Sequence, residues 1–255
     1  MFTFAGTGKK QIACQPNAPH RGFEPGKNKN WDNMKKNEKY PIYSYSNREL
    51  KILESYIEKE FGEYQEVFHE IVSPDVHLDI AIIPPNAGQD YYKLVTFGAG
   101  AYKMNVPKEL KKYKLTRAEY AIFLPKTWDI KSEKEEYYWA IRQLKNIARL
   151  PVDCETWLAF GHTITANEDF SPVAENTKLN SFVLLNSIGK NNQIVKPVKI
   201  NPFEEINFYQ LYPLYQEELD YKLQNSLDDL MNKIDKTDLD FVVNINRKNY
   251  CQQAL

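Results

Sequence analysis

The sequence contains few cysteines and no long apolar run, and each absence excludes a class of protein. Its three cysteines, Cys14, Cys154 and Cys251, lie 140 and 97 residues apart, so the close pairs of structural zinc sites and redox motifs are missing. Such cysteine usage favours a reducing cytosol. There is no stretch of about 18 consecutive apolar residues and no apolar core of signal-peptide length near residue 1. We therefore expect a cytoplasmic protein that does not span a membrane.

Neither sign of charge is in excess, since 33 Lys and Arg face 34 Asp and Glu. A general nucleic-acid binder needs surplus Lys and Arg to displace counterions from phosphates, so that function is not expected. The balance is uneven along the chain. Residues 1–45 have eight basic and three acidic side chains, a net charge of +5, whereas 201–255 have five and ten, a net charge of −5. The two ends are solvated surfaces or lie against each other, or the acidic end faces a basic partner.

The sequence pattern divides the chain into a basic irregular N-terminal extension, 1–45, and a folded domain, 46–255. The extension is rich in Lys, Asn, Pro and Gly and shows no sustained period. We predict a single α+β domain, in which helices flank one mixed β-sheet. Helices are expected over 46–62, over 132–150 and as one long helix after Pro213, and strands over 77–84, 92–97, 117–125, 157–162, 181–188, 205–211 and 239–246.

Candidate catalytic and metal-binding residues are sparse. His77 and Asp79 lie two positions apart on an expected strand and so share a face, and His162 would have to join them from another strand. No His-Glu-x-x-His helix or Gly-x-Ser-x-Gly elbow is present. Hydrogen-bonded strand residues are the favoured interpretation of His77 and His162. We expect no catalytic residue, metal, cofactor or small-molecule substrate, and a metal-dependent enzyme using His77, Asp79 and His162 is the weakest alternative.

Glu119 is a carboxylate within an otherwise apolar strand. Arg117 lies two positions away and shares its face, so we predict a structural ion pair between the two. The segment 97–102, Phe-Gly-Ala-Gly-Ala-Tyr, has a pair of glycines after a strand. It lacks the third glycine and the following helix of a nucleotide-binding loop. A tight, shaped loop is therefore expected.

Six blocks in sequence order carry a resemblance to a known family: HLDIAIIPP (77–85), YYKLVTFGAGAYKMNVP (91–107), RAEYAIFLP (117–125), YYWAIRQLKNIARLP (137–151), TWLAFGHTI (156–164) and INFYQLYPLYQEELDYKL (206–223). Together they resemble the Suppressor-of-fused domain family in its bacterial single-domain form, over about 46–235. The resemblance implies a compact domain that binds another protein without catalysis. In the two-domain animal relatives, a short peptide of a zinc-finger transcription factor is held between the domains, partly by adding a strand. Bacterial single-domain members resemble immunity proteins of polymorphic toxin systems.

The resemblance also implies candidate sites. The loop 96–104 matches the segment that lies near the peptide site in the animal relatives, and Tyr102 is the first candidate contact because tyrosine offers a rigid apolar face with a polar tip. The alternative is that Phe97 and Tyr102 pack in the domain's own core. The candidate contacts on this loop are Phe97, Gly98, Gly100, Tyr102 and Met104. The residues expected to be structural or to shape the site are Glu119, His77, Asp79 and His162.

These observations lead to two functional predictions that do not involve catalysis. The first is an immunity protein, or antitoxin, that binds and neutralises a cognate toxin, its on-rate raised by acidic side chains that attract a basic toxin. Candidate contacts on this acidic segment are Glu217, Glu218 and Asp220. The alternative is an adaptor that sequesters a short peptide of a regulatory protein by strand addition.

Overall fold

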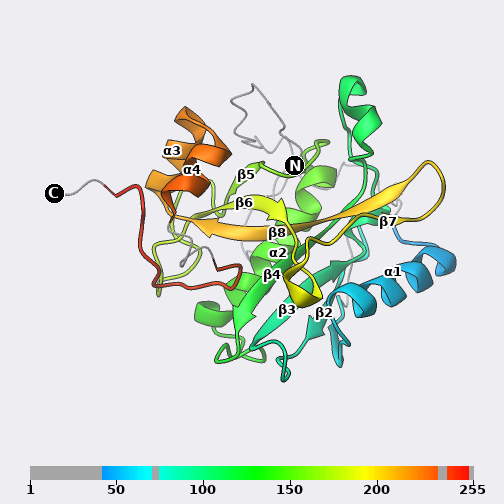
Figure 1. Cartoon of the computed structure of the whole chain (residues 1–255), viewed down its shortest axis with the longest axis horizontal. Coiled ribbons are helices and arrows are strands. Elements are labelled where there is room, and N and C mark those ends of the chain that lie inside the picture. Colours follow the sequence, from blue (N-terminus) through cyan, green and yellow to red (C-terminus); the bar gives the residue numbers. More distant parts are fainter. Residues whose placement is uncertain (1–41, 71–74, 235–239, 253–255) are drawn as a thin grey trace, which may run out of the picture.

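The computed structural model describes residues 42–70, 75–234 and 240–252. These residues form one mixed sheet with helices on both faces (Figure 1). The strands are β1 (Glu66–Phe68), β2 (Asp79–Ile83), β3 (Tyr91–Phe97), β4 (Ala118–Pro125), β5 (Thr163–Thr165), β6 (Ser181–Asn186), β7 (Val198–Lys199) and β8 (Glu205–Leu214). The α-helices are α1 (Asn47–Glu60), α2 (Glu135–Asp153), α3 (Gln216–Gln224) and α4 (Leu227–Lys233), and the short 3-10 helices are η1 (Ala99–Ala101), η2 (Lys108–Tyr113) and η3 (Lys190–Asn192).

The strand order is β1-β2-β3-β4-β8-β6-β5, and β7 pairs with β8 outside this path. Only β4 and β8 run parallel among the paired strands, which confirms a mixed sheet. The first two predicted strands, over 77–84 and 92–97, correspond to β2 and β3, which pair in an antiparallel hairpin. The central strands are therefore β4 and β8, and the edges are the short strands β1 and β5.

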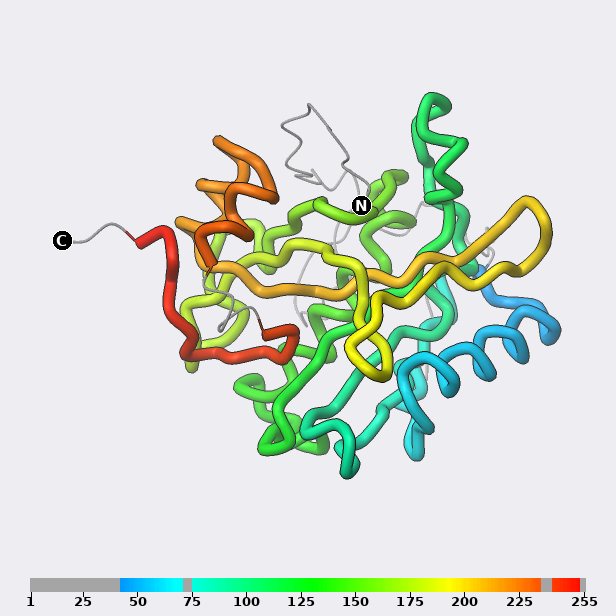
Figure 2. The backbone as a smooth tube through the Cα atoms, in the orientation of Figure 1, coloured from blue at the N-terminus to red at the C-terminus, as the bar shows by residue number. Residues whose placement is uncertain are grey.

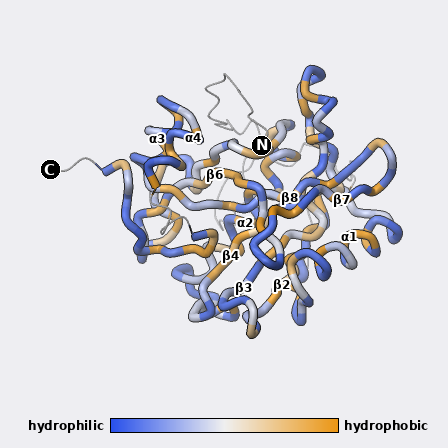
Figure 3. The backbone as a smooth tube through the Cα atoms, viewed as in Figure 1, coloured by the Kyte–Doolittle hydropathy of each residue, from blue (hydrophilic) through white to orange (hydrophobic). Residues whose placement is uncertain are grey.

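Alternate residues of the central strands face two separate cores, which explains why these strands are apolar throughout. One core packs the sheet against α2 and includes Ile80, Leu94 and Ile122. The other packs it against α1 and includes Ala81, Val95 and Phe123. Figure 3 shows the resulting concentration of apolar residues on β4 and β8 and the hydrophilic character of α3 and α4.

Helix boundaries agree with the sequence where the signal is local. Ser46 caps α1 through a capping box with Glu49, so this helix begins where the sequence predicts. By contrast, α2 begins at Glu135 without a side-chain cap and passes through Pro151 to Asp153, so the predicted bounds of 132 and 150 are wrong. A proline in the last turn removes only one helical hydrogen bond.

The chain after residue 156 differs most from the prediction. The expected strand 157–162 is wrong, because Gly161 adopts φ +82° and turns the chain before β5. The helix expected after Pro213 is also wrong at its start, since Pro213 lies inside β8. The single long helix is broken into α3 and α4, where the Ser226 side chain caps the second one.

The strand predicted over 239–246 begins outside the described residues, and its remainder forms a single bridge between Val242 and Phe123. Two short strands, β1 and β7, were not predicted, because two or three residues are too few for a recognisable period. Among the described helices, none is long and apolar enough to cross a bilayer.

Candidate functional site

The candidate site is built around Glu119, which lies on β4 and is completely buried. A carboxyl group at such a position must be hydrogen-bonded, because its transfer from water is otherwise costly. The two oxygens accept five hydrogen bonds: from the hydroxyls of Tyr45 at 2.5 Å and Thr96 at 2.6 Å, and from the backbone N–H groups of Gly98, Ala99 and Gly100 at 3.1, 3.2 and 3.1 Å. The loop after β3 thus encloses a carboxylate of the chain itself.

Three consecutive backbone N–H groups that converge on one anion form a nest, an arrangement that elsewhere binds phosphate or other anions. Here the anion position is filled by Glu119. Gly98 has φ +135°, and a Cβ there would lie 2.0 Å from the carbonyl oxygen of His77. A Cβ on Gly100 would lie 2.4 Å from the Tyr45 hydroxyl. The two glycines are therefore required by the domain's own packing, as expected for a tight, shaped loop.

The pKa shifts of Glu119 and Tyr45 are consistent with a stable hydrogen-bonded cluster. Burial raises the pKa of the Glu119 carboxyl, and the hydrogen bonds from Thr96, Tyr45 and the backbone oppose that rise. Burial also raises the pKa of the Tyr45 hydroxyl well above its usual range, and the Glu119 carboxylate raises it further, so Tyr45 remains a donor. Thr96 Oγ1 accepts from the backbone N–H of Tyr120 at 2.8 Å while it donates to Glu119. A network with this degree of satisfaction fits a structural role better than proton transfer.

The predicted ion pair between Arg117 and Glu119 is wrong. Arg117 Nη1 instead lies 2.7 Å from Glu49 Oε1 and 3.4 Å from Glu204 Oε2, and its Nε donates to the carbonyl oxygen of Gly100 at 2.6 Å. Arg117 thus holds the outer side of the loop whose inner side binds Glu119. It also connects the loop to α1 and to the turn before β8.

Three aromatic side chains, of which two are exposed, lie on this loop or on segments that contact it. The rings of Tyr43 and Tyr102 are in edge contact, with centroids 5.1 Å apart. Lys103, the next residue, forms an ion pair with Glu204, which follows Phe203. Phe203 is 85% exposed, the most exposed of the large apolar side chains that the structure describes, and Tyr43 is 38% exposed. We call Tyr43, Tyr102 and Phe203 the aromatic surface.

The turn that carries Phe203 is held by its own hydrogen bonds. Asn201 Oδ1 accepts from the backbone N–H groups of Phe203 at 2.9 Å and Glu204 at 3.0 Å. Asn201 Nδ2 donates to Glu204 Oε2 at 3.1 Å. Figure 2 shows this turn, between β7 and β8, at the same end of the molecule as the segment that leads to η2. Phe203 is therefore presented to solvent on a fixed backbone.

The structure separates the other contact candidates of the loop. Gly98 and Gly100 are buried beneath Glu119, and Met104 is buried at 6% exposure, where its sulfur lies 3.7 Å from the Tyr120 hydroxyl. Phe97 is half-buried and packs with the core on the α1 face. Tyr102 is partly buried against the α2 core, and its ring edge meets Tyr43.

The acidic candidates fall into two groups. Glu217 and Asp220 are exposed on α3, where they accept hydrogen bonds from Asn249 at 2.8 Å and Gln216 at 2.9 Å. Glu218 is completely buried and forms a bidentate ion pair with Arg247. Only the first group is placed to meet a partner directly.

Asp79 and His77 lie close together, but His162 lies elsewhere. Asp79 Oδ2 lies 3.1 Å from His69 Nδ1 and 3.6 Å from His77 Nε2, and Asp79 Oδ1 accepts from the backbone N–H of Glu70 at 3.2 Å. His162 instead stacks edge-on against Trp157, with centroids 4.4 Å apart. In the described part of the chain, no three His, Cys, Asp or Glu side chains form a group that could hold a metal ion.

Several residues of the site were not predicted. Tyr43 and Tyr45 belong to the segment 1–45 that was expected to be an irregular extension, yet Tyr43 bridges to Val76 and Tyr45 reaches Glu119. Residues 1–41 of that extension lie outside the described residues. Phe203 carried one usable signal, since it follows Asn201 and Pro202, a pair typical of a turn.

The mixed sheet with helices on both faces makes this chain an α+β domain. The family model "Suppressor of fused protein (SUFU)" matches residues 74–248, and the chain belongs to that family. An uncharacterized protein of Ureaplasma parvum is 28% identical over 211 residues, which cover 82% of this chain and 98% of the relative.

Two solved structures share the fold. A putative SUFU homolog from Neisseria gonorrhoeae superposes with a TM-score of 0.57 at 18% identity, covering 80% of this chain and 98% of that one. A chain of the Sufu–Fu complex superposes with a TM-score of 0.55 at 13% identity, covering 81% and 98%. The bacterial relatives support the assignment to the single-domain form of the family.

Proposed function

We propose that this chain is a non-catalytic protein-binding domain and that its partner docks on the aromatic surface. The observation that carries the proposal is Phe203, an apolar ring 85% exposed on a turn fixed by Asn201. Protein interfaces concentrate their binding energy in a few such aromatic anchors, and a rigid anchor loses little conformational freedom on binding. The family and the similarity to a chain of the Sufu–Fu complex support a protein as the partner.

Within this class we propose an immunity protein that binds and neutralises a cognate toxin. The support is the resemblance to immunity proteins of polymorphic toxin systems, together with an acidic surface on the helix pair α3–α4. Its exposed carboxylates are Glu217, Asp220, Asp228 and Asp229. Such a surface attracts a basic protein at long range and raises its association rate.

The adaptor that adds a peptide strand at a sheet edge has weaker support. The two edge strands, β1 and β5, have three residues each. Edges this short offer few main-chain hydrogen bonds to an incoming strand. The aromatic surface is therefore the better candidate for first contact.

The test is co-expression of the full chain with candidate toxin-domain proteins, starting with any that a neighbouring reading frame encodes. We expect recovery of growth and a stable complex. Phe203→Ser should weaken the complex by about 2 kcal/mol, roughly thirtyfold, because it removes an anchor. Phe170→Ser is the matched control, since Phe170 is also exposed, at 43%, but lies on the loop after β5.

The outcomes distinguish the immunity role from the more general role in protein binding. A complex without recovery of growth refutes the immunity role and leaves the binding role. Equal weakening by both serine variants refutes the aromatic surface. A rate of association that does not fall with added salt refutes the role given to the carboxylates of α3–α4.

A further inference from the structure

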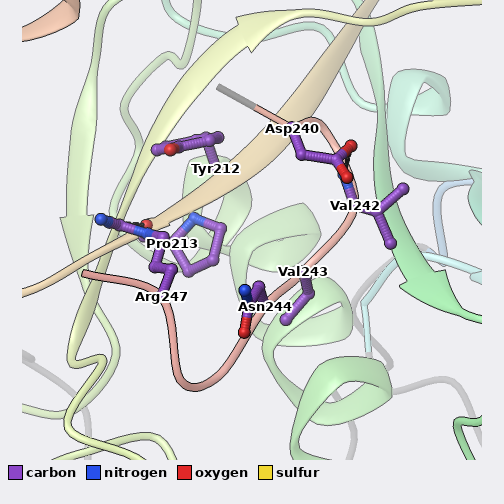
Figure 4. A pocket seen from close by; sticks show the side chains of 7 residues that line it. All are labelled: Tyr212, Pro213, Asp240, Val242, Val243, Asn244 and Arg247. Carbon is purple, nitrogen blue, oxygen red and sulfur yellow. Dashed lines mark hydrogen bonds between the residues drawn. The ribbon is translucent and has the colours of Figure 1, made fainter. Parts of the chain in front are cut away.

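The sheet is split between its two central strands. The parallel pairing of β4 with β8 runs from Ala118 opposite Asn207 to Ala121 opposite Gln210. Beyond that point β8 continues along β6, and the facing side of β4 bridges to Val242 instead. Residues 240–247 thus lie in the slot that opens between β4 and β8, as the close-up in Figure 4 shows. We call residues 240–252 the strap.

The strap occupies a strand position without forming a strand ladder. In the part of the chain that the structure describes, the strap meets β4 at a single bridge, between Val242 and Phe123, where the Val243 N–H donates to the Phe123 oxygen at 2.8 Å. Side chains of the domain donate to three of the strap carbonyls. Gln210 donates to Phe241 at 2.7 Å, Thr177 to Ile245 at 3.0 Å and Tyr215 to Arg247 at 2.6 Å. By contrast, the strand pairs β3–β4 and β6–β8 are each joined by a continuous ladder of paired residues.

The contact between strap and sheet is also incompletely filled. A small pocket of about 120 Å³, open to solvent, lies between β8, at Tyr212 and Pro213, and the strap (Figure 4). Two buried polar atoms at this contact, Arg247 Nε and Gln210 Oε1, have no hydrogen-bond partner in the described part of the chain. Voids and unsatisfied polar atoms both lower the stability of a packed contact.

The strongest attachment of the strap is the ion pair between Arg247 and Glu218. Arg247 also donates to the Pro213 oxygen at 2.8 Å and lies over the rings of Tyr212 and Tyr215, at 5.3 and 4.9 Å from their centroids. A buried ion pair gains little net free energy, because desolvation offsets most of the attraction. Release of the strap returns both charges to water.

From these four observations we propose that the strap is releasable. Residues 240–252 leave the slot while the rest of the sheet stays folded. Segments with few main-chain hydrogen bonds and incomplete packing are the ones that open locally in folded proteins. The proposal does not depend on the aromatic surface or on the identity of any partner.

The first test is amide hydrogen exchange on the full chain. We expect the Val243 amide, although buried and hydrogen-bonded, to exchange about a hundredfold faster than the amides of the β3–β4 ladder. Exchange of Val243 at the same rate as that ladder would show that the strap opens only on global unfolding, and would overturn the proposal.

The second test measures binding of a labelled peptide with the sequence of residues 240–250, DFVVNINRKNY. Arg247→Met weakens the strap but leaves Glu218 available to the arginine of the peptide, so we expect this variant to bind about tenfold more tightly than the unaltered chain. Arg142→Met is the matched control, because Arg142 pairs with Glu135 on α2. Equal affinity of the two methionine variants, or binding of a scrambled peptide, contradicts the proposal.

A third variant decides the question if Arg247→Met does not fold. Tyr215→Phe removes only the hydrogen bond to the Arg247 carbonyl. Faster exchange of Val243 in this variant, with the β3–β4 ladder unchanged, supports a releasable strap. Unchanged exchange of Val243 overturns it.

Discussion

Glu119 and Glu218 are both completely buried, but the domain compensates their burial in different ways. Glu119 receives hydroxyl and backbone donors and no cation. Glu218 receives the guanidinium of Arg247, together with the backbone N–H groups of Tyr215 at 3.1 Å and Tyr250 at 3.2 Å. The first carboxylate is held by a loop of the central sheet, and the second by a segment near the end of the described chain.

This difference shows what each carboxylate does for the fold. The donors of Glu119 come from the segment before α1, from β3 and from η1, so the carboxylate joins three parts of the central domain. Glu218 joins α3 to the strap. The loss of Glu119 therefore affects the whole sheet. The loss of the Glu218 contact affects only the strap, and release of the strap would expose the charges of Arg247 and Glu218 to water.

The largest expected effect follows from Glu119→Gln. Each Glu119 oxygen faces at least one backbone N–H group, which can only donate, so an amide NH₂ in either position makes at least one close contact repulsive. We expect the free energy of unfolding to fall by about 4 kcal/mol, measured by urea denaturation. Glu133→Gln, at an exposed position, should change it by less than about 0.5 kcal/mol. A loss under about 1 kcal/mol at Glu119 would contradict the role assigned to the nest.

A smaller effect is expected from Arg247→Met, about 2 kcal/mol, although it leaves a buried carboxylate without its cation. The reason is that water can reach the Glu218 carboxylate when the strap is released, whereas Glu119 stays buried in the central sheet. Adding Glu218→Met should restore most of the loss, because the pair is replaced by apolar side chains of similar length. Strictly additive losses in urea denaturation would show that the two side chains do not act as a pair.

The contrast also explains which parts of the site could be predicted. The capping box of α1 and the apolar central strands depend on neighbouring residues or on a period of two, and both were predictable. Glu119 was recognisable as a buried carboxylate. Its partners were not, because Tyr45, Thr96 and Gly98 are brought to it by the fold from separate segments.

The errors have specific causes. Arg117 was assigned to Glu119 because residues two apart on a strand share a face, but a long arginine side chain reaches groups on other elements, here Glu49 and Glu204. The break between α3 and α4 had a readable signal, since Ser226 followed by Asp229 is typical of a helix start. The slot for the strap had no readable signal in the sequence, because its position depends on where β4 and β8 diverge in the folded sheet.

A third buried charge, Lys93, tests whether a buried charge with little compensation limits stability. Its Nζ donates to the Phe61 carbonyl oxygen at 3.3 Å, and burial, with a contribution from Lys190, lowers its pKa to about 8. Between that value and the usual lysine value, the unfolded chain binds the extra proton, so stability rises with pH.

We therefore expect the unfolding free energy to increase from pH 8 to pH 10 by about 2 kcal/mol relative to the Lys93→Met variant, which lacks this titration. The measurement is urea denaturation of both proteins across this range. Lys126→Met, at an exposed position, is the control and should follow the unaltered chain. If the unfolding free energies of the unaltered chain and of Lys93→Met change with pH in parallel, the charge on Lys93 does not limit stability.

The smallest expected effect tests one donor of the Glu119 cluster. Tyr45→Phe removes the hydroxyl that donates to Glu119 at 2.5 Å, and Tyr56→Phe removes one that donates to the Lys196 carbonyl oxygen at 2.6 Å. Hydrogen bonds to a carboxylate are stronger than those to a carbonyl, so we expect Tyr45→Phe to lower the unfolding free energy by about 1 kcal/mol more than Tyr56→Phe. Equal losses would mean that the remaining four donors satisfy Glu119 without Tyr45. In that case the nest and the Thr96 hydroxyl, without the hydroxyl from the segment before α1, compensate the burial of this carboxylate.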